Sequence, residues 1–313
     1  MGCWAIGGPW DMMGSPAGWG AVDDIESTRA IHAALDLGVT LFDTAANYGA
    51  GRSERVLGAA LKGRRGDVVI ATKFGYDIDE ANKAVIPYGA AEEESDVPGH
   101  VRENLEDSLR RLGTDYVDVY LLHVWGLELG RALATRDILE ELVAEGKIRT
   151  YGWSTDRADA VEDFSIGAGC SVVEQALNVL DGNDEVLAVA ERLNLASFNR
   201  APLGMGLLTG KITPETRFHD DDIRQKVEWF VGFKDGHANQ EWLDALASIR
   251  EILTSNGRTL AQGALAWIWG RSEATIPLPG FRTVAQVQEN ARAMEFGPLS
   301  PDQMAEVDRI LGR

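Results

Sequence analysis

The feature that most constrains the fold is the regular alternation of short apolar runs with longer helical patterns. The apolar runs are rich in β-branched and aromatic residues, and six of them recur, at residues 39–43, 67–73, 116–123, 149–154, 171–175 and 195–200. Several are apolar nearly throughout, as is typical of strands that are covered on both faces. This alternation predicts parallel strands joined by helical crossovers.

Two shorter segments, at residues 2–6 and 274–278, bring the expected strand count to eight, the number that closes a barrel. No strand pattern remains for a second sheet. We therefore expect one domain over residues 1–313, an α/β protein folded as a (β/α)8 TIM barrel with long loops on its C-terminal face. The first strand has few residues from which to form, so it is expected to be short or truncated at the N-terminus.

The helical patterns and the loops between them can also be placed. One amphipathic helix carries its apolar residues on a single face, at Val101, Leu105, Leu109 and Leu112. Capping boxes are expected at two helix starts, one formed by Asp23 with Glu26 and the other by Ser300 with Gln303. Residues 77–99 and 211–236 lack regular patterning and predict lids or binding loops. Their acidic triplets, at residues 92–94 and 220–222, are expected to be solvated.

Charge and composition exclude several classes of partner. The formal net charge of −19 would repel a nucleic-acid backbone or an anionic membrane surface, so a small-molecule substrate fits better. No stretch approaches the ~18 to 20 apolar residues that span a bilayer. The two cysteines, Cys3 and Cys170, show no spacing typical of disulfides or thiolate metal sites. A cytoplasmic location is therefore expected, while the oligomeric state stays open.

Polar residues end several of the expected strands, namely Asp43, Lys73, His123, Ser154, Gln175 and Arg200. In a barrel the side chains at these strand ends converge on one mouth, where active sites lie. Each residue taken alone has an ordinary structural explanation, such as a helix cap, a surface charge or a core histidine. Their recurrence at strand ends favours a functional site.

The residue types suggest a proton-transfer mechanism. Tyr48, in the loop after Asp43, can protonate an alkoxide, although it could also be a loop tyrosine packed on the rim. The ammonium of Lys73 would lower the pKa of Tyr48, and the carboxylate of Asp43 would keep Lys73 charged. His123 could donate a hydrogen bond to a substrate carbonyl and stabilise the developing oxyanion.

Five motifs, in order along nearly the whole chain, resemble those of the aldo-keto reductases. They are FDTAANYGAGRSERVLGAAL (42–61), VIATKFG (69–75), DYVDVYLLH (115–123), GKIRTYGWST (146–155) and PLGMGLLTGK (202–211). The resemblance implies an (α/β)8 barrel, a nicotinamide cofactor that is usually NADPH, with NADH as the alternative, and reversible reduction of an aldehyde or ketone to an alcohol. It also implies the same catalytic residues, Asp43, Tyr48, Lys73 and His123.

The resemblance further implies a cofactor site. Ser154 and Gln175 would bind the nicotinamide carboxamide, and the planar guanidinium of Arg200 would stack on the ring. The glycine-rich segment would wrap the pyrophosphate, through Pro202, Leu203, Gly204, Gly206, Leu208 and Lys211. Residues 277–290 resemble the segment that binds the adenosine half, through Gly280, Arg282, Gln286, Glu289 and Asn290. Arg282 favours the 2′-phosphate of NADP. Helix capping and surface ion pairs are the alternative explanation of these residues.

Several tryptophans fall in loops on the same side of the expected barrel. Trp4, Trp19 and Trp125 could wall a substrate pocket around Tyr48, although each could also serve only in packing. Trp229, Phe230 and Phe233 in the second long loop could close over cofactor or substrate.

Two other classes of function compete with a reductase. A metal-dependent barrel hydrolase would need several histidine ligands, and the five histidines show no H-x-H or H-x-x-x-H pair. A regulatory protein could keep the barrel, bind the cofactor and turn over little. Its mark would be a lost catalytic residue, and the chain retains all four.

Overall fold

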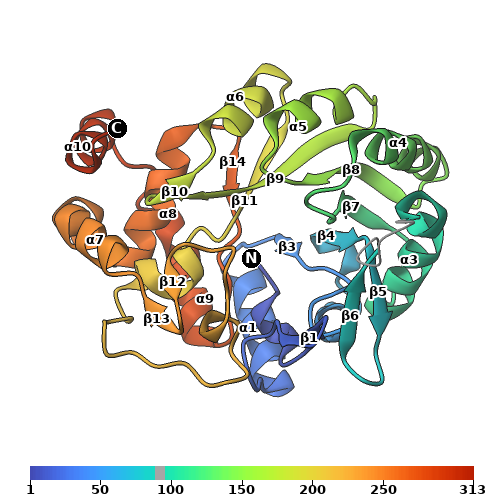
Figure 1. Cartoon of the computed structure of the whole chain (residues 1–313), viewed down its shortest axis with the longest axis horizontal. Coiled ribbons are helices and arrows are strands. Elements are labelled where there is room, and N and C mark those ends of the chain that lie inside the picture. The colour runs from blue at the N-terminus through green and yellow to red at the C-terminus, as the bar shows by residue number, and fades with distance from the viewer. Residues whose placement is uncertain (89–95) are drawn as a thin grey trace.

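The computed structural model describes residues 1–88 and 96–313. Within this part of the chain, seven parallel strands form a curled sheet with the order β14-β11-β9-β8-β7-β4-β3, and the helices lie outside it (Figure 1). The strands are β3 (Leu41–Asp43), β4 (Val69–Phe74), β7 (Val117–Leu122), β8 (Ile148–Ser154), β9 (Cys170–Asn178), β11 (Ala196–Arg200) and β14 (Thr275–Pro277). All seven coincide with apolar runs of the sequence, and the predicted (β/α)8 barrel is confirmed.

The gap between β3 and β14 is bridged by a single residue, Gly2. It pairs in parallel with Asp43 on one side and with Gly280 on the other. Its amide donates to the carbonyl of Pro279 at 2.9 Å, and the amide of Cys3 donates to the carbonyl of Asp43 at 2.7 Å. The prediction of a strand over residues 2–6 is therefore wrong in extent, because the backbone turns into a 3-10 helix immediately afterwards, η1 (Ala5–Gly7).

The helices pack against their sequence neighbours around the barrel, and α1 also packs on α9. They are α1 (Asp24–Asp36), α2 (Arg52–Ala60), α3 (Val97–Leu112), α4 (Leu129–Ala144), α5 (Ala158–Phe164), α6 (Asp184–Arg192), α7 (Gln240–Leu253), α8 (Leu260–Arg271), α9 (Val284–Ala291) and α10 (Pro301–Leu311). The four apolar residues predicted to share one face of α3 are all buried. Among the described residues, no helix is both long enough and apolar enough to cross a membrane.

Helix capping follows the sequence at one predicted site and departs from it at the other. Ser300 and Gln303 form the expected reciprocal capping box at the start of α10. At α1, the side chain of Asp23 accepts from the amide of Ile25, but Glu26 accepts instead from the amide of Val284, 258 residues away. The predicted box at α1 is therefore wrong, because its acidic residue links α1 to the start of α9.

The two long segments are more ordered than expected. Between residues 77 and 99 the chain forms an antiparallel hairpin of β5 (Tyr76–Asp79) and β6 (Ala84–Pro87). Strand β6 also pairs with β1 (Asp11–Met12), which pairs in turn with β2 (Ser15–Pro16). The prediction of an irregular loop is wrong here, because residues distant in sequence complete a small sheet. The acidic triplet at 92–94 lies outside the described residues.

The second segment remains mostly irregular. It contains the short elements η4 (Ile223–Gln225) and β12 (Phe233–Lys234), and β13 (His237–Ala238) follows its end. Asp220 and Asp221 are exposed, as expected. Asp222 is not, since its carboxylate is buried and accepts hydrogen bonds from the guanidinium of Arg224.

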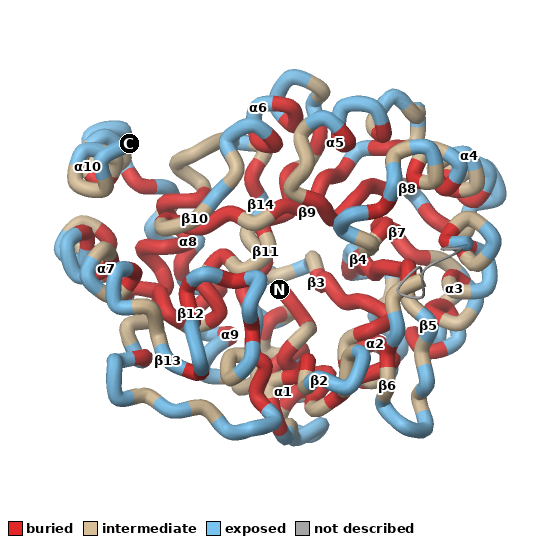
Figure 2. Tube along the Cα trace, in the orientation of Figure 1, coloured by how far each residue is buried: buried red, intermediate tan, exposed pale blue. Residues whose placement is uncertain are grey.

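The strands of the barrel consist mostly of buried residues (Figure 2). Their side chains form an inner and an outer part of the core. The inner part fills the barrel and consists of Ala71, Val119, Leu121, Val172, Phe198 and Leu278. The outer part lies between strands and helices. Because side chains alternate across a strand, each strand contributes to both parts, which explains its nearly continuous apolar sequence.

Candidate active site

Three of the four predicted catalytic residues meet at Lys73, near the end of β4. Its side chain is fully buried, and its ammonium lies 2.5 Å from Oδ1 of Asp43. The same ammonium lies 3.3 Å from the hydroxyl of Tyr48 and donates to the carbonyl of Thr44 at 3.0 Å. The parallel register of β3 and β4 brings Asp43 and Lys73 to the same end of the barrel.

The charges around Lys73 keep it protonated. Burial alone would lower the pKa of Lys73, but the carboxylates of Asp43 and Glu174 raise it above its ordinary value. A positive charge is therefore held next to the phenol of Tyr48.

Tyr48 itself does not titrate as the sequence suggested. Burial raises its pKa above the ordinary value of tyrosine, and the opposing effect of Lys73 is smaller. The expectation of a lowered pKa is therefore wrong for the protein without ligands, because loss of hydration outweighs the ammonium. Tyr48 is a protonated phenol, which is the form that a proton donor needs.

His123 follows β7 and places its ring edge-on to Tyr48, with ring centroids 6.0 Å apart. A second tyrosine, Tyr76, approaches from the hairpin at 5.4 Å and donates its hydroxyl to the His123 carbonyl. Burial and the positive charges of Lys73 and Arg200 hold the pKa of His123 well below its usual range. The ring is therefore neutral near pH 7, and its buried Nδ1 lacks a hydrogen-bond partner among the described residues.

Glu174 completes the charged cluster and was not predicted from the sequence. It lies on β9, only 1 % exposed, with Oε2 at 3.4 Å from Nζ of Lys73 and Oε1 accepting from the hydroxyl of Ser154 at 3.2 Å. Burial and the neighbouring charge of Asp43 raise the pKa of Glu174 to about 7, against the lowering effect of Lys73. Oε2 accepts no hydrogen bond from the described residues.

The structure separates the predicted carboxamide ligands. Ser154 lies in the barrel beside Glu174, whereas Gln175 points to the opposite side of β9 and donates to the hydroxyl of Ser197 at 2.9 Å. Arg200, at the end of β11, forms an ion pair with Asp156. A nicotinamide carboxamide offers one donor and one acceptor. The buried Oε2 of Glu174, which accepts no hydrogen bond from the described residues, can accept from its amide, whereas the hydroxyl proton of Ser154 is already donated to Oε1 of Glu174.

The glycine-rich segment forms a 3-10 turn, η3 (Gly204–Thr209), with left-handed backbone at Gly204, Met205 and Gly206. Three of its amides already donate to backbone carbonyls, those of Gly204, Gly206 and Leu208. The expected role of these three amides in holding a pyrophosphate therefore gains no support from their contacts. Of the other residues assigned to this part of the site, Pro202 is buried, and Leu203 and Lys211 are more accessible.

The predicted adenosine-binding residues gather at the corner between β14 and α9. Arg282 donates to the carbonyls of Trp19 and Ala21, which ties the N-terminal segment to this corner. Of the remaining residues, Gln286 caps α9 and Asn290 donates to the carbonyl of Gly280, whereas Glu289 pairs at 3.4 Å with Lys211 of the glycine-rich segment. These contacts agree with the alternative explanation of the residues, helix capping and surface ion pairs. A cofactor site also requires that the residues lie close together, and they do.

Aromatic rings line the mouth beside Tyr48. The ring of Trp4 stacks on Tyr48 at 5.9 Å, Trp19 meets Trp4 edge-on at 5.2 Å, and Trp229 stacks on Trp4 at 6.4 Å. Trp229 comes from the second long loop and is 59 % exposed. Trp125 lies exposed after β7, where its carbonyl accepts from the hydroxyl of Thr155.

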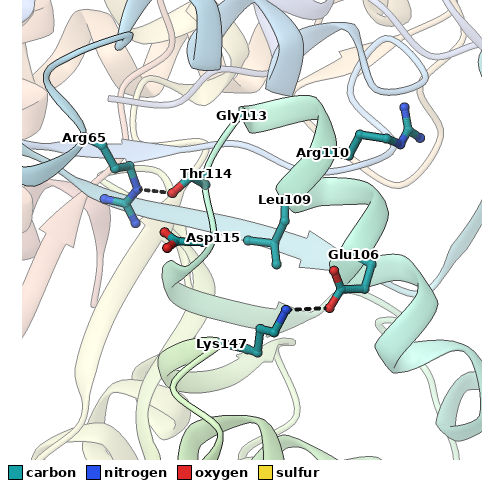
Figure 3. Close-up of a pocket in the computed structure, with 8 residues that line it drawn as sticks. All are labelled: Arg65, Glu106, Leu109, Arg110, Gly113, Thr114, Asp115 and Lys147. Carbon is teal, nitrogen blue, oxygen red and sulfur yellow. Dashed lines mark hydrogen bonds and ion pairs between the residues drawn. The ribbon is translucent and has the colours of Figure 1, made fainter.

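An open hollow lies at the other end of the barrel (Figure 3). Its lining residues lie before the N-terminal ends of β4, β7 and β8, opposite to the strand ends that carry Lys73, His123 and Ser154. They are Arg65, Glu106, Leu109, Arg110, Gly113, Thr114, Asp115 and Lys147. The three cations of the hollow are each paired with a carboxylate, of Asp118, Asp107 and Glu106 respectively. This hollow therefore belongs to the end of a barrel associated with stability rather than catalysis.

No group of three or more metal-ligating side chains gathers within residues 1–88 and 96–313. The cluster around Lys73 consists instead of two carboxylates, one ammonium, one phenol and one neutral imidazole. This set can hold and move a proton next to a reacting oxygen.

Comparisons with known proteins agree with this chemistry. The model of the aldo/keto reductase family matches residues 1–311. Aldo-keto reductase YhdN of Bacillus subtilis is 33% identical over 97% of this chain and 86% of its own length. The glycerol dehydrogenase AKR11B4 of Gluconobacter oxydans superposes with a TM-score of 0.81 at 31% identity, over 100% of this chain and 90% of that one. An aldo-keto reductase of Klebsiella pneumoniae in complex with NADPH gives 0.66 at 27% identity, over 92% and 85%. The chain is a member of the aldo/keto reductase family.

Proposed function

We propose that this protein catalyses the reversible, NADP(H)-dependent reduction of a small aldehyde or ketone to an alcohol, with Tyr48 as the proton donor. The observation that carries the proposal is the contact of one buried ammonium, that of Lys73, with both Asp43 and Tyr48. A phenol poised on a fixed positive charge can give its proton to a growing alkoxide and has its phenolate stabilised afterwards.

Each residue of the cluster around Lys73 has its own role in this reaction. Tyr48 and the neutral His123 bind the carbonyl oxygen of the substrate and orient it, since both can donate a hydrogen bond. When bound, the nicotinamide cofactor supplies a hydride to the carbonyl carbon. As charge develops on the oxygen, Tyr48 transfers its proton, and Lys73 stabilises the phenolate that remains. Asp43 keeps Lys73 charged and in position.

The cofactor is assigned to NADP(H) on two grounds. The Klebsiella pneumoniae relative was solved with NADPH. Arg282, Gln286, Glu289 and Asn290 stand together at the corner of β14 and α9, and the guanidinium of Arg282 can bind a 2′-phosphate. NADH is the alternative, since Arg282 already donates to two backbone carbonyls.

The substrate is assigned to the class of small carbonyl compounds and their alcohols. Trp4 stacks on Tyr48, and Trp19 and Trp229 in turn contact Trp4. Such walls favour small or planar apolar groups next to the reacting carbonyl. Trp125, exposed after β7, is proposed as a further wall of the substrate pocket.

A fluorescence titration of the purified protein with NADPH and with NADH tests the proposal, followed by absorbance decay of NADPH with a panel of small aldehydes and ketones. We expect tight NADPH binding and carbonyl-dependent oxidation of NADPH. Binding without turnover of any carbonyl would favour a cofactor-binding regulatory protein instead. No binding of either cofactor would refute the assignment.

A further inference from the structure

Glu174 is a buried acid that takes no part in the proton transfer of the proposed reaction. Four residues suffice to orient and protonate the carbonyl, yet a fifth titratable side chain faces the same ammonium at 3.4 Å. Its Oε1 accepts from Ser154, while its Oε2 lies buried without a hydrogen bond from the described residues. A carboxylate in this position changes the charge of the barrel mouth each time it gains or loses a proton.

The charges facing Glu174 come from several strands. Lys73 on β4 carries +1 and Asp43 on β3 carries −1. Arg200 on β11 is balanced by its ion pair with Asp156. The remaining titratable neighbours, Tyr48 and His123, are uncharged near pH 7, by the burial effects described above. The mouth is therefore neutral when Glu174 is protonated and carries −1 when Glu174 is ionised.

The nicotinamide ring carries the complementary charge in only one of its two states. It is a cation when oxidised and uncharged when reduced. The ring must lie beside Tyr48 in any productive complex, because the hydride goes to the carbon whose oxygen Tyr48 protonates. The ammonium of Lys73 lies between Glu174 and that hydroxyl. Its Nζ is 3.4 Å from Oε2 of Glu174 and 3.3 Å from the hydroxyl oxygen of Tyr48.

We infer that Glu174 couples a proton to the oxidation state of the bound cofactor. Binding of the oxidised cofactor expels the proton of Glu174, whereas binding of the reduced cofactor leaves that proton in place. Ionised Glu174 then favours the oxidised form and so the oxidation of alcohols as pH rises. The inference rests on the proposed function, because it requires the nicotinamide to bind at this mouth.

The change in cofactor affinity expected when Glu174 ionises is large enough to measure. Opposite unit charges separated by about 7 Å at an effective dielectric constant of about 20 attract strongly enough to change affinity at least about tenfold. The pKa of Glu174, about 7 in the protein without ligands, places the change in the accessible range. The ratio of the dissociation constants of NADPH and NADP+ should thus rise severalfold between pH 6 and pH 8.

The experiment measures both dissociation constants from pH 5.5 to 8.5 for the wild-type protein and two variants. Glu174→Gln keeps the shape and hydrogen-bonding ability of the side chain but cannot ionise. Glu54→Gln is the matched control, because Glu54 is equally buried yet bonds Thr72 and Arg111 outside the barrel lumen. Comparing the two cofactor forms cancels the titration of the 2′-phosphate, which both forms carry.

We expect the ratio to rise with pH in the wild type and in Glu54→Gln, and to stay flat in Glu174→Gln. Calorimetry in buffers of different ionisation enthalpy should also show that the wild type releases more protons near pH 6.5 when it binds NADP+ than when it binds NADPH, since the 2′-phosphate contributes equally to both. Equal pH slopes in the wild type and Glu174→Gln would overturn the inference while leaving the proposed function standing. If Glu174→Gln does not fold, equal proton release by the wild type on binding NADP+ and NADPH overturns it. Failure to bind either form would refute the proposed function itself.

Discussion

Lys73 is the residue on which the charges of the site depend. Its ammonium contacts the side chains of Asp43, Tyr48 and Glu174, and it has no access to water. A lone buried ammonium would lose its proton, and two lone buried carboxylates would gain theirs. The cluster remains charged only as a unit, so each of its members affects how the others titrate.

Tyr48→Phe should lower turnover by about 10²- to 10⁴-fold, because the substitution removes the proton donor and leaves the ring. Cofactor affinity should change little, since the phenyl group keeps its stacking contact with Trp4. Steady-state kinetics and a fluorescence titration on the same preparation measure the two effects. Equal losses of turnover and of cofactor affinity would show that Tyr48 supports the structure instead.

Glu174→Gln should stabilise the protein more at pH 8 than at pH 5. The pKa of Glu174 is about 7 in the folded state, above the ordinary value of 4.5 for a glutamate, so between these pH values the folded state binds a proton that the unfolded state has lost. Ionised Glu174 therefore costs stability increasingly as pH rises from about 4.5 to about 7. The glutamine variant should avoid this cost, and its relative gain should grow by roughly 2 to 3 kcal/mol between pH 5 and pH 8.

Urea unfolding at the two pH values measures this difference. Glu54→Gln serves again as the control, and it should lose stability at both pH values because Arg111 loses its charged partner. An effect of Glu174→Gln that is the same at pH 5 and pH 8 would show that Glu174 does not titrate between them.

At the scale of elements, the strands were predictable because their signal is local. Each strand of the barrel is an apolar run, and a polar residue at its end is visible in the sequence. The local sequence does not show, however, whether that residue faces the barrel lumen or the surrounding helices. Strand β9 is buried on both sides, so Val172 and Val173 give no sign of which one faces the lumen, and the choice between Glu174 and Gln175 depends on it. The β-bulge at Tyr151 and Gly152 on the neighbouring strand shifts the register further.

The hairpin of β5 and β6 was not predictable for another reason. Its strands are short and partly polar, and they gain their remaining partner from β1, more than 70 residues earlier in the chain. Long-range pairing of this kind leaves no periodic pattern within either segment. The same holds for Glu26, whose bond to the amide of Val284 replaces a local capping bond.

Arg282→Met tests the role of the corner between β14 and α9. Methionine keeps much of the side-chain length but cannot bind a phosphate, so NADPH affinity should fall about tenfold or more while NADH affinity changes less. Isothermal titration with both cofactors gives the comparison. An equal fall for NADPH and NADH would mean that Arg282 acts only by holding the carbonyls of Trp19 and Ala21.

At the scale of the whole molecule, the barrel is closed by very little backbone. One residue, Gly2, joins β3 to the segment after β14, and the carbonyl of Asp43 takes part in the same pairing. Asp43, the proposed partner of Lys73, is thus paired at the point where the barrel closes. Substitutions at Gly2 should therefore alter both the stability of the fold and the position of Asp43.

Gly2→Ala tests this connection. A Cβ on Gly2 would lie 2.9 Å from the carbonyl oxygen of Leu278, so the backbone must shift, at a cost of about 1 to 3 kcal/mol of unfolding free energy. Because the shift moves the pairing of Asp43, turnover should fall as well. Gly66→Ala is the control, since a Cβ there meets nothing within 4 Å, and it should leave both quantities nearly unchanged. Urea unfolding and steady-state kinetics measure the pair of effects. A Gly2→Ala protein as stable and active as Gly66→Ala would show that the closing contact is dispensable.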